Sequence, residues 1–226
     1  MIKVAAALLL GCASSAVRAE LVTWTFAEFP RIADHHARVL GAPRAQIVDG
    51  RHALCFDGRS DGVIVTTNPL AGQAQFTIEV LIKPDGTGDE EQRFLHIEDE
   101  RASRLLLETR LTRERQWALD TFMYASSEDN RVLLDRAKLH AADRWHWVAL
   151  SFDGRTMAHY VNGAKEMDGP VPFHPMKDGR ISLGVRLNER SWYKGCIAEV
   201  RFTSEALASP TRIVDSLRPE TFDSRR

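Results

Sequence analysis

The segment 144–165 constrains the fold more than any other part of the chain, because it contains two β-prone runs separated by a tight-turn dipeptide. The runs span Trp145–Phe152 and Met157–Val161; Asp153-Gly154 lies between them and Asn162-Gly163 follows the second. Asp-Gly and Asn-Gly readily adopt the positive φ that two-residue hairpin turns require. The segment therefore predicts antiparallel strands rather than a helix.

Turn dipeptides of the same kind divide the rest of the chain into short segments. They are Asp49-Gly50, Asp57-Gly58, Asp61-Gly62, Asp85-Gly86, Asp168-Gly169 and Asp178-Gly179. In the run 76–83 apolar side chains alternate with Thr77, Glu79 and Lys83, which predicts a half-buried strand. Many short strands with regular turns predict an all-β fold, a two-sheet antiparallel β-sandwich. The predicted core contains Phe76, Ile78, Val80, Ile82, Val148, Leu150, Phe152, Leu183 and Ile197.

Two segments depart from the strand pattern. The run 130–142 could form a short helix, and Ser209-Pro210 has a capping residue followed by a first-turn proline, which predicts a short C-terminal helix. The chain after Arg218 is polar. We therefore expect one domain over residues 20–208, followed by a short helix and a polar tail over 209–226.

Composition excludes some classes of partner. The 226 residues are 44% hydrophobic and 27% charged, enough for a real core, and 30 Lys and Arg against 31 Asp and Glu leave a formal net charge of -1. Nucleic acids and anionic membranes favour basic surfaces, so neither is an expected partner.

Residues 1–19 have the pattern of an export signal. Lys3 is followed by an apolar stretch, and Val17-Arg18-Ala19 offers the small residues of a cleavage site, so Glu20 would begin a secreted or periplasmic protein. Leu9-Leu10-Gly11-Cys12 resembles a lipobox, which leaves lipidation at Cys12 as the alternative. The apolar stretch falls short of the roughly 20 residues that a transmembrane helix needs, so no transmembrane segment is expected.

Cleavage after Ala19 would leave two cysteines, Cys55 and Cys196. An even pair in an oxidising compartment is compatible with a disulfide. Two buried free thiols, acting as small hydrophobic groups, remain the alternative.

Five blocks of sequence, in order, resemble the laminin-G-like jelly-roll domains of the concanavalin A-like lectin and glucanase superfamily. They are Leu21–Phe26, Ala53–Gly58, Phe76–Pro84, Trp145–Gly163 and Gly195–Arg201. The resemblance covers nearly all of the mature chain and implies a jelly-roll sandwich. It also implies that the strands carrying Cys55 and Cys196 run side by side. It does not define function, because this fold hosts lectins, adhesion modules, glycosidases and lyases.

Two positions depart from the family pattern. Leu81 replaces an aromatic residue, and Ala198 stands where an acidic residue often helps to hold calcium in related sandwiches. Asp57 and Asp61 could still supply oxygen ligands to a calcium ion, although both residues are also typical of turns. No other cofactor is expected.

Strand parity predicts a ligand-facing patch on one concave sheet. Glu108 and Arg110 would share one face of their strand, and Arg186 and Asn188 would share one face of a run continuing from Arg180. The predicted patch is Glu108, Arg110, Asp120, Arg186, Asn188 and Trp192, with His96, His146 and Trp117 on nearby runs. Arginine binds carboxylates, tryptophan stacks on sugar rings, and Asn and Asp accept hydrogen bonds from sugar hydroxyl groups, so the patch suits an acidic or neutral glycan. Ordinary cross-strand ion pairs on a solvated face are the alternative.

Other candidate motifs are weak. Glu98-Asp99-Glu100 lacks the spacing that would aim carboxylates into one cleft, and His35-His36 would point to opposite sides of an extended chain. Cys-x-x-Cys, phosphate-loop and Gly-x-Ser-x-Gly motifs are absent from the sequence, so redox, nucleotide and α/β-hydrolase chemistry are not expected.

The leading hypothesis is a secreted, non-catalytic module that binds carbohydrate or matrix, its partner a glycan or another extracellular polymer. One alternative is a polysaccharide lyase or glycoside hydrolase, with Glu108, Asp120, His96 or His146 as acid and base and an arginine neutralising a uronate. A second is an envelope protein-interaction domain.

Overall fold

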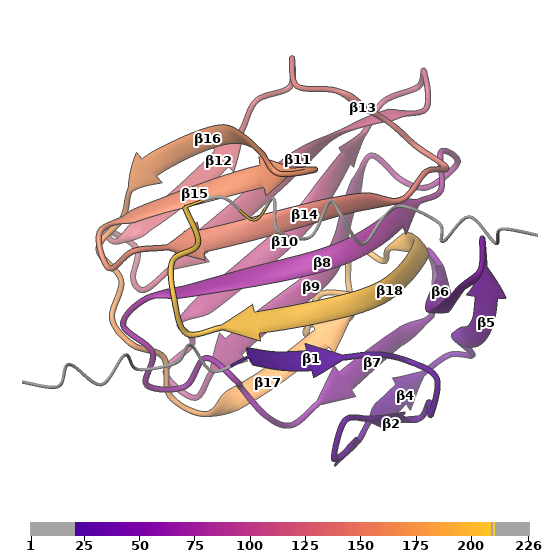
Figure 1. Cartoon of the computed structure of the whole chain (residues 1–226), viewed down its shortest axis with the longest axis horizontal. Coiled ribbons are helices and arrows are strands. Elements are labelled where there is room, and N and C mark those ends of the chain that lie inside the picture. Colours follow the sequence, from indigo (N-terminus) through magenta and orange to yellow (C-terminus); the bar gives the residue numbers. More distant parts are fainter. Residues whose placement is uncertain (1–20, 209, 211–226) are drawn as a thin grey trace, which may run out of the picture.

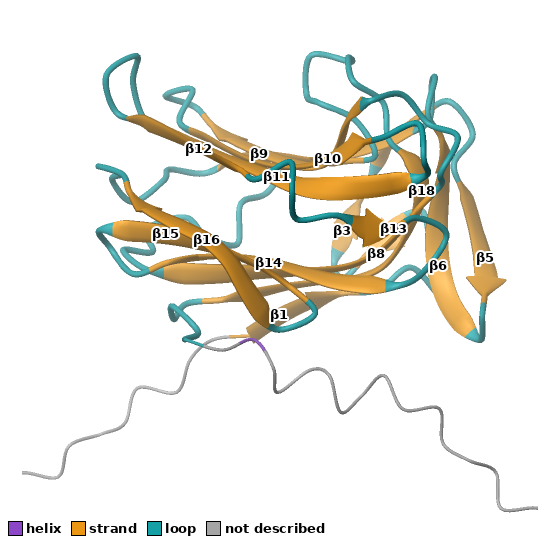
Figure 2. Cartoon of the chain, turned by 90° about the horizontal axis from the view of Figure 1, so that it is seen from above, coloured by secondary structure: helices purple, strands orange, loops and turns teal. Residues whose placement is uncertain are grey.

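The computed structural model describes residues 21–208 and 210. They form two antiparallel eight-stranded sheets, which we name the β8 sheet and the β10 sheet after a central strand of each. Figure 2 shows the sheets stacked as two layers of a sandwich. The predicted all-β jelly-roll sandwich is confirmed. The predicted signal (1–19) and the predicted C-terminal helix and tail (209–226) lie outside the described residues, apart from Pro210.

The β8 sheet contains, in spatial order, β16 (Ala164–Pro170), β15 (Thr156–Val161), β14 (His146–Phe152), β8 (Phe76–Pro84), β18 (Lys194–Thr203), β6 (Arg51–Asp57) and β5 (Arg44–Val48), with β1 (Leu21–Trp24) also paired to β18. The β10 sheet contains β12 (Asn130–Leu134), β11 (Gln116–Tyr124), β10 (Arg104–Leu111), β9 (Glu91–Asp99), β17 (Gly179–Leu183), β7 (Gly62–Val65) and β4 (Arg38–Leu40), with β13 (His140–Ala141) paired to β11. Short strands β2 (Arg31–Ile32) and β3 (His35–His36) pair with each other. Strands from both ends of the chain, β1 and β18, lie side by side (Figure 1).

The hydrophobic core fills the space between the two sheets. All of the predicted core residues are buried in it, because the period-two alternation directs one face of each strand inward. The Phe76 ring lies 5.7 Å from that of Phe152 and 6.5 Å from that of Phe173, centroid to centroid. This aromatic packing joins β8 and β14 to the segment that precedes β17.

Strand β8 is buried on both faces, so the predicted half-buried strand is wrong. Thr77, Glu79 and Leu81 point away from the core and yet are at most 3% exposed. The reason lies on neighbouring strands: Trp147 is also buried on this outer face, and the Arg201 guanidinium lies over its ring at 4.7 Å. Large side chains from β14 and β18 thus cover the middle of the sheet.

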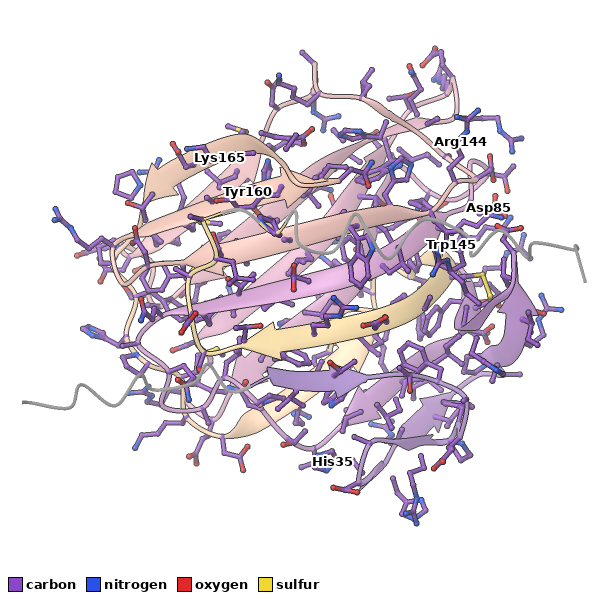
Figure 3. All side chains as sticks on the ribbon, viewed as in Figure 1. His35, Asp85, Arg144, Trp145, Tyr160 and Lys165 are labelled. Atoms are coloured by element: carbon purple, nitrogen blue, oxygen red, sulfur yellow. A yellow bond between two sulfur atoms is a disulfide. The ribbon has the colours of Figure 1, made fainter. Side chains whose placement is uncertain are left out.

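A disulfide joins β6 to β18. Cys55 and Cys196 are direct partners in the strand register, with Cα atoms 4.0 Å apart and a sequence separation of 141. Figure 3 shows it as a yellow bond between the sulfur atoms. The adjacency that the family resemblance implied is confirmed, and the alternative of two free thiols is not what the structure contains.

The segment 130–142 is not helical. Asn130–Leu134 pairs with the free edge of β11, a turn around Asp135 follows, and His140–Ala141 pairs with β11 again. Backbone hydrogen bonds to an open sheet edge replace those that a helix would have formed internally. The predicted helix is therefore wrong.

Candidate functional site

The candidate site is the outer face of the β10 sheet. Leu105 and Leu107 of β10 point into the core, so Glu108 and Arg110 point outward. On β11, Asp120 lies directly opposite Glu108. The sequence therefore places polar and charged side chains on the outer surface of the same strands that build the core.

Glu108, Arg110 and Asp120 belong to one network of ion pairs with Glu91 and Arg93, which we call the ion-pair network. Arg110 contacts Glu108 at 3.0 Å, Asp120 at 2.6 Å and Glu91 at 2.5 Å, while Arg93 contacts Glu91 and lies 3.2 Å from Glu108. Arg93 Nε has no hydrogen bond, so its approach to Glu108 is an ion pair without hydrogen-bond geometry. The cross-strand ion pairs of the alternative interpretation are thus present, but Glu108 and Asp120 are at most 3% exposed rather than solvated.

Burial dominates the electrostatics of this network. It raises the pKa of Glu108 to about 7 despite the opposing charge of Arg93, and it raises the pKa of Asp120 despite Arg110. Glu91 behaves differently: burial raises its pKa, but Arg93 and Arg110 together hold it below its usual value. The pKa values differ because Glu108 and Asp120 are both buried and share Arg110, whereas Glu91 is more exposed and pairs with two arginines.

A β-bulge shapes this part of β9. The partner of Leu107 is Leu95 and that of Glu108 is Arg93, so Phe94 is an extra residue in the ladder. Phe94 is buried in the core beside Tyr193, their ring centroids 5.8 Å apart. The bulge therefore allows two successive apolar residues to point inward while Arg93 points outward into the network.

His96 occupies the middle of the outer face and is 1% exposed. Its partners in the register are Leu106 of β10 and Ser182 of β17. The backbone N–H of Leu187 donates to its Nδ1 at 3.0 Å. Burial lowers the pKa of His96 to about 3, and four arginines reinforce this effect: Arg186, Arg104, Arg93 and Arg180. We call these four residues the arginine cluster.

Aromatic side chains lie at the next register positions. Phe122 is paired with Leu106 and Tyr124 with Arg104, and both rings are half-buried on the outer face. Their centroids are 6.0 Å apart, and the Arg104 guanidinium lies 3.8 Å from the Tyr124 ring centroid. The guanidinium therefore stacks on the Tyr124 ring, two residues along β10 from Leu106, the partner of His96.

The loop between β17 and β18 carries the remaining predicted residues. The strand ends at Leu183, so the expected extended run through Asn188 is wrong. Gly184 follows with φ +79°, and Arg186 N–H donates to the Arg190 carbonyl within a turn. Arg186 is half-buried and Asn188 exposed.

Trp192 lies farther along the same side of the β10 sheet. The Trp192 ring packs close to Gly62 of β7, since a Cβ at position 62 would lie 3.4 Å from it. Val63 points into the core, so the adjacent position 62 faces outward, and Trp192 lies on that outer side. The six predicted patch residues therefore lie on the outer side of the β10 sheet or in its β17–β18 loop. Whether they bind a ligand, and whether the face is concave, stay predictions.

Trp117 and His146 do not join this face. Trp117 is fully buried in the core, and its ring contacts His146 of β14 at a centroid distance of 5.2 Å. Burial also lowers the pKa of His146, whose Nε2 hydrogen-bonds the Ala141 carbonyl. Both residues fill the space between the sheets.

The three acidic residues that follow His96 and Ile97, at positions 98–100, each have a different environment. Glu98 points outward near the arginine cluster, Glu100 is exposed, and Asp99 is buried, where it accepts the backbone N–H groups of Arg101, Ser103 and Lys177. These carboxylates border a cleft of about 540 Å³ that Asp178 and Arg180 also line. Asp99 is thus a loop-forming residue.

Asp57 and Asp61 both organise turns. Asp57 accepts the backbone N–H groups of Arg59, Ser60 and Asp61, which lowers its pKa to about 2, although burial opposes the shift. Asp61 accepts the N–H of Ala42. Over residues 21–208 and 210, no group of three or more His, Cys, Asp or Glu is placed to hold a metal ion. Calcium binding by this pair stays a prediction.

Strand parity could have identified two further site residues. Phe122 and Tyr124 follow Asp120 at intervals of two, so the alternation that placed Asp120 outward places them outward too. Arg93 could not be assigned in this way, because the bulge at Phe94 changes the parity of β9.

Residues 57–211, more than half of the chain, match the family model for the concanavalin A-like lectin/glucanases superfamily. The chain therefore belongs to the concanavalin A-like lectin/glucanases superfamily. A search of curated protein sequences gave no match. Within the described residues, no helix has the length and apolar character to span a membrane.

Solved structures similar to this superfamily member include an arabinanase domain, a neurotoxin binding domain and a pentraxin. Domain 4 of AbnA, a GH43 extracellular arabinanase from Geobacillus stearothermophilus, in complex with arabinotriose, is 16% identical with a TM-score of 0.59, over 81% of this chain and 88% of that one. The binding domain of botulinum neurotoxin DC in complex with SialylT is 12% identical with a TM-score of 0.64, over 88% and 51%. A heptameric SAP-like pentraxin from Limulus polyphemus is 17% identical with a TM-score of 0.58, over 72% and 79%. At these identities the likeness shows the fold.

Proposed function

We propose that the protein is a secreted carbohydrate-binding module whose ligand-binding surface is the outer face of the β10 sheet. One observation carries the proposal: half-buried aromatic rings, Phe122 and Tyr124, lie next to a dense set of hydrogen-bonding charged side chains. Sugar rings have apolar faces that stack on aromatic side chains and hydroxyl rims that hydrogen-bond to charged groups. The arrangement offers both kinds of contact on one surface.

The comparisons and the disulfide support the proposal. The arabinanase domain was solved with arabinotriose and the toxin domain with SialylT. The Cys55–Cys196 disulfide suits an oxidising compartment, as does the export signal predicted over residues 1–19.

The division of roles within the patch follows from exposure. Glu108 and Asp120 are at most 3% exposed and are held by Arg110, so they fix the position of that arginine. Asn188, Arg186 and Trp192 reach solvent to a greater extent and are the groups that a ligand meets first, together with Phe122 and Tyr124.

Glycan-array screening of the mature protein tests the proposal, followed by calorimetry on the best ligand. Replacing Tyr124 or Phe122 with alanine should weaken binding about tenfold, because one stacking contact is lost. Trp145→Ala is the matched control: Trp145 is a half-buried aromatic residue immediately before β14 of the other sheet (Figure 3), and its loss should leave binding unchanged. Absence of binding to any glycan would contradict the proposal and favour a protein-interaction domain.

A polysaccharide lyase or glycoside hydrolase is the second candidate, favoured by one observation. Glu108, whose pKa is raised to about 7, lies directly opposite Asp120 of the adjacent strand β11, and a carboxyl group with such a pKa can act as a general acid at neutral pH. Assays for unsaturated products and new reducing ends, on any glycan that binds, test this candidate. Glu108→Gln should abolish turnover if Glu108 is the acid.

A further inference from the structure

Apart from Arg93 Nε, which lies 3.2 Å from Glu108, three buried N–H donors on the outer face of the β10 sheet have no hydrogen-bond acceptor. The Leu187 N–H donates to His96 Nδ1, so Nδ1 accepts and the proton of the neutral ring lies on Nε2. His96 Nε2 is buried and makes no hydrogen bond, and the same is true of Arg104 Nε and Arg186 Nε. Buried donors in proteins are nearly always paired with a protein group or a bound molecule, so these three N–H groups are available to an acceptor from outside the chain.

The charges around these donors are mostly positive. The carboxylate contacts at this end of the face are long: Glu98 lies 3.8 Å from His96 Nε2 and 3.7 Å from Arg180. Burial, reinforced by Arg93 and Arg104, also lowers the pKa of Arg186. Arg110, by contrast, is satisfied by three carboxylates at the other end of the face. The outer face therefore has an acid-rich end and an arginine-rich end.

We propose that His96, Arg104 and Arg186 bind an anionic oxygen group, the carboxylate or sulfate ester of an acidic glycan. The inference rests on the proposed carbohydrate-binding function and narrows its ligand class. Arginines and a ring N–H all donate, and an anionic oxygen accepts several such hydrogen bonds at once. Arg104 stacks on Tyr124, so the anion would lie beside the aromatic surface that receives the sugar ring.

The test compares acidic oligosaccharides with neutral partners of the same backbone at constant ionic strength. Oligogalacturonate against its methyl ester examines a carboxylate, and dextran sulfate against dextran examines a sulfate. Calorimetry should show that the acidic member of at least one pair binds about tenfold more tightly, or better, than its neutral partner. Equal binding within both pairs would overturn the inference.

Variants assign the effect to these residues. Arg186→Gln and Arg104→Gln should each remove most of the preference for the acidic member, while Arg155→Gln, an exposed arginine in the β14–β15 turn, should keep it. Two variants are tested so that the assignment can still be checked if one of them fails to fold. A preference that survives both folded variants would overturn the assignment.

A second readout separates this inference from the proposed function. Titration with inorganic sulfate, followed by ¹⁵N NMR of the His96 ring, should shift the Nε2–H resonance in the wild type and not in Arg186→Gln. If sulfate produces the shift but no glycan binds, the anion site stands and the proposed function fails. If neutral glycans bind but neither sulfate nor an acidic group has any effect, the function stands and the anion site is wrong.

Discussion

Leu187 donates its backbone N–H to Nδ1 of His96 at 3.0 Å and so joins the β17–β18 loop to the middle of the β10 sheet. One hydrogen bond has two consequences. It determines which ring nitrogen of His96 carries the proton, and it positions Arg186, the residue before Leu187, over the outer face. The loop and the sheet thus contribute to one site.

His96 should stay neutral well below the usual titration range of histidine. Its pKa is lowered to about 3 by burial and by the arginine cluster, so the ring should keep the Nε2–H tautomer in ¹⁵N-edited NMR spectra down to about pH 4. Because the folded-state pKa lies below the unfolded value, the contribution of His96 to stability is complete above about pH 6.5 and decreases as the pH falls toward 3.

His96→Asn provides the comparison for that prediction. Asparagine can accept the Leu187 N–H through its side-chain oxygen but does not titrate. Its unfolding free energy should fall less steeply between about pH 6.5 and pH 4 than that of the wild type. A His96 ring that protonates near pH 6.5 in the native protein would contradict the assignment.

Arg110→Met should destabilise the protein more than any other single arginine replacement on this face. It leaves Glu108 and Asp120 buried without their shared cation, a loss of about 3–5 kcal/mol by analogy with other broken buried ion pairs. The loss should shrink as the pH falls below about 7, where Glu108 becomes protonated. Urea unfolding at several pH values measures both effects.

The matched control is Arg136→Met. Arg136 pairs with Glu90 where both side chains are more than half exposed, so its loss should change stability by less than about 1 kcal/mol. Similar effects of the two replacements would show that the ion-pair network contributes no more than a surface pair.

Glu79 should make the protein less stable as the pH rises. Burial raises its pKa to about 7, partly opposed by Arg201, and its Oε1 has no hydrogen-bond partner. A raised carboxyl pKa gives stability that is complete below about pH 4.5 and is lost as the pH rises through 7, an effect on the order of 3 kcal/mol. Glu79→Gln should remove this decline, and Glu199→Gln should only reduce it, because the charge of Glu199 contributes to the raised pKa of Glu79. Parallel pH profiles for wild type and Glu79→Gln would refute the prediction.

Loss of the Cys55–Cys196 disulfide should lower the free energy of unfolding. The bridge closes a loop with a sequence separation of 141, for which chain-entropy estimates give roughly 4 to 5 kcal/mol. The double replacement Cys55→Ala and Cys196→Ala, compared with wild type with and without reductant, separates loss of the bond from loss of packing. Mass spectrometry that finds two free thiols in exported protein would contradict the bond itself.

Local sequence patterns predicted much of the fold. The alternation in Phe76–Lys83 and the turn at Asp153-Gly154 each involve a few neighbouring residues, whose backbone preferences and side-chain directions follow from short-range sterics. The same parity correctly put Glu108 and Arg110 on one side of β10. The sequence-based predictions were wrong where distant segments decide the outcome. Asn130–Leu134 forms a strand because β11 has a free edge. Glu79 is buried because Trp147 and Arg201 of the neighbouring strands cover it.

The sequence by itself determined the sandwich class, the inward face of each regular strand and the candidate charged residues, because these depend on period-two alternation and turn chemistry within short windows. Only the tertiary structure decided that Phe94 bulges, that Arg93 joins the ion-pair network, and that Leu187 reaches His96 across 91 residues of sequence. Those contacts depend on which strands pair and in what register. Pairing is a property of the whole core, since a shift of one residue would exchange the inner and outer faces of every strand involved.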